Sequence, residues 1–138
     1  MSRLRIESGD YVFEGSLEKG LAPRTCAWFL DQLPFKSQAI HARWSGEAVW
    51  LPLGDLESGL VAENHTVHPS RGDVLFYVGG VSEAEILLVY GSAIFASRAG
   101  KLAGNHFFTI ETGHEKLTEF GNKILWEGAQ EIEFTSIG

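Results

Sequence analysis

A histidine and an arginine two residues apart, His41 and Arg43, form the most promising polar pair in the sequence. They fall in a strand-like segment, residues 37–44, and alternate residues of a strand point to the same face of a sheet. The apolar alternate residues, ending with Trp44, would face the core, so that His41 and Arg43 would lie side by side on the outer surface. Arginine presents a planar fork that suits a carboxylate or a phosphate, and histidine exchanges protons near neutral pH. The pair therefore indicates a site for a small, at least partly anionic ligand.

Two further polar residues continue from the same side of this segment, Ser45 and Glu47. A structural alternative is that Arg43 forms an ion pair with Glu47 or with Glu63, because networks of structural ion pairs also place charges in clefts. The sequence leaves the ligand site and the ion pair equally open.

Other candidates for the same pocket come from distant parts of the chain. Residues 54–72 show no periodicity, and so long an irregular segment is typical of a functional loop. We expect it to form a pocket rim, with Glu63 and Asn64 closing a turn against the Arg43 strand. The amide of Asn105 could offer a hydrogen-bond donor and an acceptor to a ligand, and the alternative is that asparagine is placed there because it suits a tight turn. Tyr77 could direct its hydroxyl into the same pocket, and the alternative is that it is a core residue with one end in water. The predicted ligand-binding residues are His41, Arg43, Glu47, Glu63, Asn64, Tyr77 and Asn105.

A metal site is a weaker alternative for the same loop. Glu63, His65 and His68 are residue types that bind zinc, nickel or iron, but they form no HxH or HExxH pattern, and we expect no metal and no cofactor. Cys26 is expected to be buried and inert, and no GxSxG motif or phosphate-binding glycine loop is present. No catalytic residue is assigned.

The charge of the chain excludes one class of partner. Its 138 residues carry a formal net charge of −7, and the basic residues are scattered, so a nucleic-acid backbone would be repelled. The sequence has neither a signal-like start nor an apolar run that approaches a membrane span. A single cysteine agrees with a reducing compartment. We expect one cytoplasmic domain, residues 1–138, that binds neither nucleic acid nor membrane.

The elements that position these residues are mainly strands. Alternation predicts a hairpin of residues 3–7 and 11–17, and helical spacing predicts helices from Ala22 to Pro34 and from Glu115 to Trp126, the second weakened at Gly121. Further strands are expected at residues 37–44, 47–53, 74–78, 85–90, 106–111 and 131–137. The run Ile86–Val89 is apolar on both faces, which predicts a central strand covered on its outer side by a helix. These patterns favour an antiparallel barrel or sandwich.

Four separated blocks carry a resemblance to a known fold: APRTCAWFL, AIHARWSGE, AGNHFFTIE and FGNKILWEG. The sequence resembles cyclophilins over most of its length. It is more similar to uncharacterised bacterial single-domain proteins with a cyclophilin-like fold, in which HARWSGE, EN, GDVLFY, YG, GNHF and LWEGA recur in this order. This resemblance implies a closed antiparallel β-barrel of about eight strands capped by two helices, and it implies no established activity.

The resemblance to cyclophilins does not extend to all the residues that prolyl isomerases use. Prolyl isomerases use an arginine with a nearby glutamine, and the segment after Arg43, SGEAVWLPLGD, has no glutamine. Our first hypothesis is therefore a small-molecule-binding barrel with its pocket around Arg43. The alternatives are a weak peptidyl-prolyl isomerase, or another enzyme that uses His41 and Arg43, and a structural protein that forms a homo-oligomer through a patch around Trp28.

Overall fold

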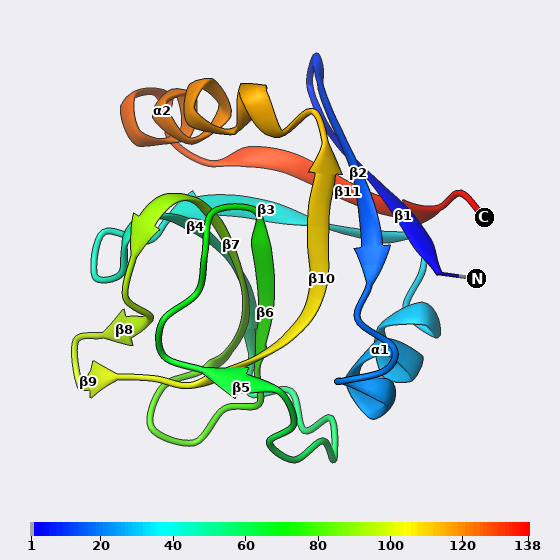
Figure 1. Ribbon diagram of the computed structural model, residues 1–138. Coiled ribbons are helices and arrows are strands. Elements are labelled where there is room, and N and C mark those ends of the chain that lie inside the picture. Colours follow the sequence, from blue (N-terminus) through cyan, green and yellow to red (C-terminus); the bar gives the residue numbers. More distant parts are fainter. Residues whose placement is uncertain (1) are drawn as a thin grey trace.

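Eight antiparallel strands close into a barrel in the computed structural model, which describes residues 2–138. Around the barrel the strands follow the order β2, β1, β11, β3, β4, β7, β6 and β10, and pairing of β10 with β2 completes the circle (Figure 1). The short β5 adds to the end of β10, and β8 pairs with β9 in a separate small hairpin. The expected closed antiparallel barrel of eight strands is confirmed.

The strands are β1 (Arg3–Ser8), β2 (Tyr11–Leu17), β3 (Phe35–His41), β4 (Gly46–Gly54), β5 (His65–Thr66), β6 (Asp73–Tyr77), β7 (Ala84–Ala93), β8 (Ala96–Ser97), β9 (Gly100–Lys101), β10 (Gly104–Thr112) and β11 (Gln130–Ser136). The helices are α1 (Pro23–Leu30), the 3-10 turn η1 (His114–Lys116) and α2 (Leu117–Glu127). Among these described elements no helix is long and apolar enough to cross a membrane.

The predicted hairpin at the start of the chain is confirmed. β1 pairs with β2 from Arg3 opposite Ser16 to Ser8 opposite Tyr11, and Gly9 in the turn has a positive φ of 58°. Glycine adopts such a conformation without the clash that a Cβ would cause. The alternating apolar residues of both strands, among them Ile6 and Phe13, point into the barrel and are fully buried.

The barrel interior is filled by one aromatic-rich core, which helix α1 helps to close. Phe29 of α1 packs with its ring centre 5.0 Å from that of Phe107 on β10 and 5.2 Å from that of Phe134 on β11. Cys26, one turn earlier, is also buried, and burial raises the pKa of its thiol to about 11. Its expected burial is confirmed. The helix ends at Leu30, four residues before the predicted end at Pro34.

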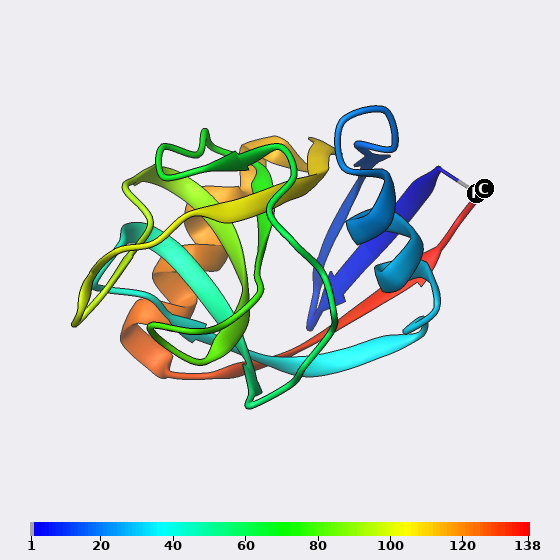
Figure 2. The same ribbon diagram turned by 90° about the horizontal axis from the view of Figure 1, so that it is seen from below.

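Helix α2 lies at the opposite end of the molecule from α1 (Figures 1 and 2). Leu117, Phe120 and Ile124 bury its apolar face. The helix continues through Gly121 to Glu127, so glycine does not break it there. A Cβ on Gly121 would come within 2.3 Å of the Tyr90 ring of β7, so the missing side chain lets helix and strand approach closely.

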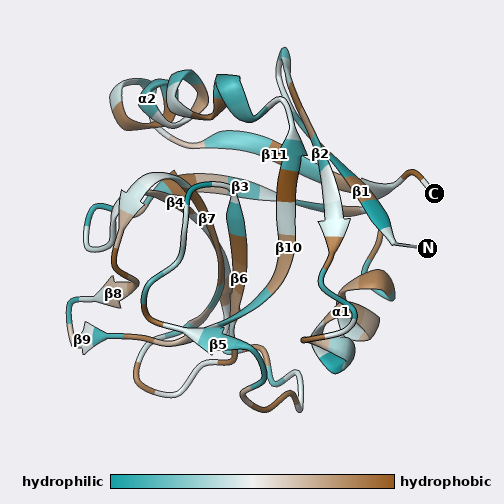
Figure 3. Cartoon of the chain, viewed as in Figure 1, coloured by the Kyte–Doolittle hydropathy of each residue, from teal (hydrophilic) through white to brown (hydrophobic). Residues whose placement is uncertain are grey.

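A second apolar layer lies on the outer face of β4, β6 and β7. Leu75, Leu87 and Val89 point outward and are covered by Phe95 and Leu102. These two residues belong to the segment 94–103, which we call the excursion and which contains β8 and β9. Figure 3 shows hydrophobic residues along β6, whereas β9 at the tip of the excursion is hydrophilic. The expectation that Ile86–Val89 is covered on both faces is confirmed, but the outer cover is this excursion and not a helix.

Candidate functional site

The turn between β3 and β4 differs from its prediction. Strand β3 ends at His41, and the backbone N–H groups of Ser45 and Gly46 both donate to the carbonyl oxygen of Ala42, at 2.9 and 3.2 Å. Gly46 has a φ of 117°, and a Cβ there would lie 2.8 Å from the Ser92 carbonyl oxygen. This tight turn interrupts the strand alternation, so Trp44 is 64% exposed and its predicted place in the core is wrong.

His41 lies on the inner face of β3 rather than on the outer surface predicted for it. Its Nε2 lies 2.7 Å from the hydroxyl of Tyr90, and its Nδ1 is buried and has no hydrogen-bond partner among residues 2–138. Burial lowers the pKa of His41, and the charge of Arg43 lowers it further, while Glu47 acts in the opposite direction. His41 therefore favours its neutral form.

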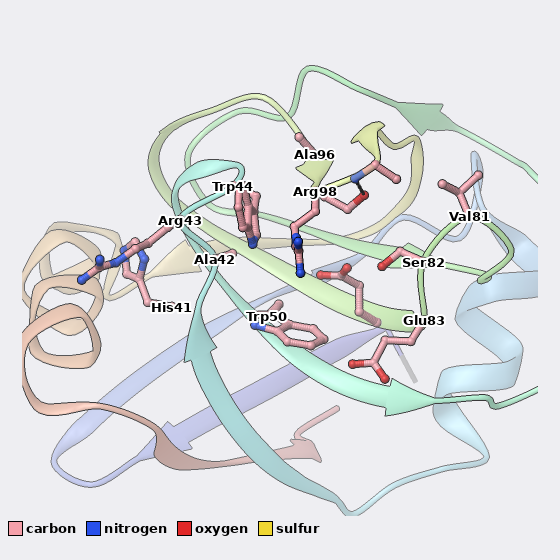
Figure 4. A pocket seen from close by; sticks show the side chains of 13 residues that line it. His41, Ala42, Arg43, Trp44, Trp50, Val81, Ser82, Glu83, Ala96 and Arg98 are labelled. Carbon is pink, nitrogen blue, oxygen red and sulfur yellow. Dashed lines mark hydrogen bonds between the residues drawn. The ribbon is translucent and has the colours of Figure 1, made fainter.

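Arg43 is exposed at the tip of this turn, beside His41 (Figure 4). Within residues 2–138 it forms an ion pair with neither Glu47 nor Glu63, so the structural alternative for Arg43 is wrong. Glu47 instead accepts a hydrogen bond from the backbone N–H of Ser92 at 2.8 Å. Its side chain fixes the start of β4 to the end of β7.

Glu63, Asn64 and Asn105 lie apart from Arg43, in a network that we call the anchor. The Glu63 carboxylate accepts hydrogen bonds from the backbone N–H and the hydroxyl of Thr25, at 2.7 and 2.9 Å. The Asn105 amide donates to the Thr25 hydroxyl and to the Val61 carbonyl, and its oxygen accepts from the Glu63 N–H. The anchor joins the loop of residues 54–72 to α1 and β10, and not to the Arg43 strand as predicted.

Asn64 completes this attachment. Its side-chain amide donates to the carbonyl oxygen of His106 at 2.8 Å, and its own carbonyl oxygen accepts from the His106 N–H. Its φ of 46° is unusual for a residue other than glycine, and asparagine tolerates it well. His65 and His68 point to solvent, and no cluster of three metal-binding side chains occurs among residues 2–138.

Tyr77 and Trp28 also have structural partners. The Tyr77 hydroxyl accepts hydrogen bonds from the backbone N–H groups of Val81 and Ser82, at 3.0 and 3.4 Å, and its ring packs edge-on against Phe95. Trp28 is half-buried, with its ring centre 4.9 Å from that of Phe76. The patch predicted around Trp28 is thus partly covered within the chain.

One pocket, which we call the outer pocket, lies against the outer face of the barrel. It has a volume of about 890 Å³ and is bounded by the β3–β4 turn, the segment before β7 and the excursion. Its lining residues are His41, Ala42, Arg43, Trp44, Trp50, Val81, Ser82, Glu83, Glu85, Ala96, Ser97, Arg98 and Ala99. Of the seven predicted ligand-binding residues it includes His41 and Arg43.

Three labelled side chains define the shape of the outer pocket. Trp44 stands at its rim, Trp50 forms its wall on β4, and Arg98 extends from the excursion into the space between them (Figure 4). His41 and Arg43 point away from Trp50, on the far side of the turn. The cation that reaches furthest into the pocket is therefore Arg98.

Two glutamates complete the lining. Glu83 is exposed, whereas Glu85 on β7 is 6% exposed. Burial raises the pKa of Glu85 to about 8, and the negative charge of Glu83 adds to the shift. The arrangement combines indole faces, a guanidinium group and a buried carboxyl group, so it can stack a planar molecule and bind polar groups at its ends.

The family described as "Protein of unknown function (DUF3830)" matches residues 4–136, nearly the whole chain. This chain is a DUF3830 protein. No curated protein matches it.

Solved structures show the same fold as this DUF3830 protein. It is similar to McbB, determined in complex with tryptophan, with a TM-score of 0.74 and 16% identity over 98% of this chain, which spans 45% of the McbB chain. It is also similar to the hypothetical protein AF2241 from Archaeoglobus fulgidus, with a TM-score of 0.65 and 21% identity over 99% of this chain and 95% of that chain. A cyclophilin-type peptidyl-prolyl isomerase from Cryptosporidium parvum gives a TM-score of 0.58 and 14% identity, with 99% of each chain covered.

Three of the pocket residues to which we give a role in the DUF3830 chain were not selected by the sequence analysis: Trp50, Glu85 and Arg98. Glu85 could have been identified from the sequence, because it stands at the start of a strand that was predicted to be covered on both faces. A carboxyl group in such a place is costly unless it has a function or a partner. Arg98 gave none, because its position depends on how the excursion folds back over the barrel.

Proposed function

We propose that this protein binds a small, partly anionic ligand in the outer pocket. The observation that carries the proposal is Arg98, whose guanidinium group enters the pocket without an ion pair to any carboxylate of residues 2–138. A guanidinium group binds a carboxylate through two parallel hydrogen bonds. Arg43 at the rim adds a second positive charge that attracts the same anion.

The walls of the pocket support a planar ligand. Trp44 and Trp50 provide indole surfaces on either side of Arg98, and aromatic side chains prefer stacked or edge-on partners. A volume of about 890 Å³ lies within the range of small-molecule sites, roughly 300–1,000 Å³. The similar structure of McbB was determined with tryptophan, which makes indole compounds suitable first probes.

The test compares 3-indolepropionate, which carries a carboxylate, with 3-methylindole, which does not. In titration calorimetry we expect Arg98→Ala to weaken the binding of 3-indolepropionate by about 10- to 100-fold, because a hydrogen-bonded charge pair is lost. The binding of 3-methylindole should not change. Arg24→Ala, which removes an exposed arginine of α1, is the matched control and should leave both affinities unchanged. Equal affinity of wild type and Arg98→Ala for 3-indolepropionate would contradict the proposal.

A further inference from the structure

The floor of the outer pocket contains a carboxyl group that has no partner. Glu85 stands on the outward-facing side of β7, opposite Pro52 of β4 and Tyr77 of β6. It is 94% buried by the protein and yet lines the pocket, and no ion pair holds its carboxyl group among residues 2–138. Its carboxyl oxygens are not sealed from solvent, because the one sealed side-chain atom without a hydrogen-bond partner among residues 2–138 is Nδ1 of His41. The Glu85 carboxyl group is therefore open to a partner that enters the pocket.

The groups around Glu85 do not supply a partner. Glu83, on the segment before β7, repels it, and the Tyr77 hydroxyl of β6 is already occupied by two backbone N–H groups. The two arginines of the lining, Arg98 from the excursion and Arg43, which points away from Trp50 at the β3–β4 turn, form no ion pair with it. His41, the remaining titratable group of the lining, is bound to Tyr90 on the inner face of the sheet.

We infer that the ligand carries a protonated amino group, which binds to Glu85, together with the anionic group that binds to Arg98. The inference rests on the proposed function and specifies its ligand class: a zwitterion of the α-amino acid type with a planar side chain. An ammonium group would satisfy the buried carboxylate, and the negative faces of Trp44 and Trp50 attract the same cation.

Binding of such a ligand has a proton balance that can be measured. Burial and the charge of Glu83 raise the pKa of Glu85 to about 8, so at neutral pH the free protein holds this proton. When the ammonium group arrives, the carboxyl group ionises, the ion pair forms and one proton leaves to solvent. The ionised fraction of Glu85 rises from about 1% at pH 6 to about 50% at pH 8, so the affinity for the zwitterion should rise by up to about 50-fold.

The experiment compares L-tryptophan with 3-indolepropionate, which lacks the amino group. Titration calorimetry at pH 6 and pH 8, in two buffers of different ionisation enthalpy, measures both affinity and proton release. For wild type we expect at least a tenfold rise in tryptophan affinity between the two pH values, with proton release, and no rise for 3-indolepropionate. Glu85→Gln should abolish the rise and still bind 3-indolepropionate. Glu57→Gln, at an exposed carboxylate outside this pocket, should behave as wild type.

The possible outcomes separate this inference from the proposed function. If 3-indolepropionate binds and tryptophan binds no better at pH 8, or if Glu85→Gln keeps the rise, the inference is wrong and the anion site stands. If wild type binds neither compound, the proposed function and the inference are both contradicted for this class of ligand.

Discussion

The anchor and the outer pocket are two polar regions that differ in exposure and in hydrogen bonding, since Asn105 of the anchor is buried whereas Arg98 of the pocket is exposed. In the anchor, Asn105 uses both donor and acceptor atoms, and Glu63 accepts two hydrogen bonds from Thr25. In the outer pocket, neither Glu85 nor Arg98 forms an ion pair among residues 2–138. Residue type does not distinguish these regions, since both contain glutamates, whereas hydrogen bonding does.

This difference agrees with a structural role for the anchor and with the ligand-binding role that we propose for the outer pocket. A buried polar group that is hydrogen-bonded within the chain stabilises the fold, whereas a buried polar group without a hydrogen bond lowers the free energy of unfolding. A ligand that hydrogen-bonds to a polar group without a partner in the chain gains binding free energy from that contact. The anchor should therefore respond to mutation in stability, and the pocket in binding.

The largest expected effect is on the anchor. Asn105→Ala removes three hydrogen bonds at a side chain that is 2% exposed and deprives the Glu63 N–H and the Val61 carbonyl of their partner. We expect the free energy of unfolding to fall by about 2–4 kcal/mol, measured by urea denaturation. Asn122→Ala, at an exposed site of α2, is the control and should change it by less than about 0.5 kcal/mol. A loss for Asn105→Ala no larger than that of the control would remove the distinction between the two regions.

The second prediction is that Glu85→Gln raises the free energy of unfolding, by an amount that depends on pH. Because the pKa of Glu85 is about 8 in the folded chain and about 4.5 ordinarily, folding keeps a proton that the unfolded chain releases between these values. The contribution of protonated Glu85 to the free energy of unfolding is fully present below about pH 4.5 and is lost as the pH rises towards 8. Glu85→Gln cannot ionise, so it should be more stable than wild type at pH 8 by roughly 1–3 kcal/mol and equal to it at pH 4.

Urea denaturation at both pH values checks this prediction. Glu57→Gln provides the comparison, because an exposed carboxylate should give a difference from wild type that does not vary with pH. If Glu85→Gln and Glu57→Gln gave the same pH profile, Glu85 would titrate as an ordinary surface glutamate.

The smallest expected effect concerns the two arginines of the pocket. Arg43 points away from Trp50 at the rim, whereas Arg98 enters between the two indoles. Arg43→Ala should therefore weaken 3-indolepropionate binding by less than about threefold, through long-range attraction alone, and the effect should disappear in high salt. Calorimetry at low and high salt measures this. A loss equal to that of Arg98→Ala would place the anion at the β3–β4 turn, where the sequence first suggested it.

The fold was largely predictable because its signals are local. Alternation in residues 3–17 marks the first hairpin, and the apolar run Ile86–Val89 marks a strand covered on both faces, as observed. What covers that strand was not predictable. The cover consists of Phe95 and Leu102, whose contact with the outer sheet depends on the path of an irregular segment.

The candidate site was predicted in part, for two physical reasons. A turn stabilised by Gly46 ends β3 at His41, which shifts every residue after it away from the expected alternation and brings Trp44 to the rim. Hydrogen bonding across the chain then holds Glu63 and Asn105 at a different place from Arg43. Neither the end of a strand nor the partner of an amide can be read from spacing alone.

The excursion packs on the barrel through Phe95 and Leu102, is hydrogen-bonded to Ser45 through Ala96, and carries Arg98 between Ala96 and Leu102. Changes at its tip therefore leave the closed barrel and its hydrogen-bonded strand order intact. Trp50 and Glu85 belong to barrel strands, whereas Arg98 belongs to the excursion, so exchange of this one short segment would change the charge offered to a ligand and keep the rest of the pocket. Related barrels with a different tip should recognise ligands of different charge on the same framework.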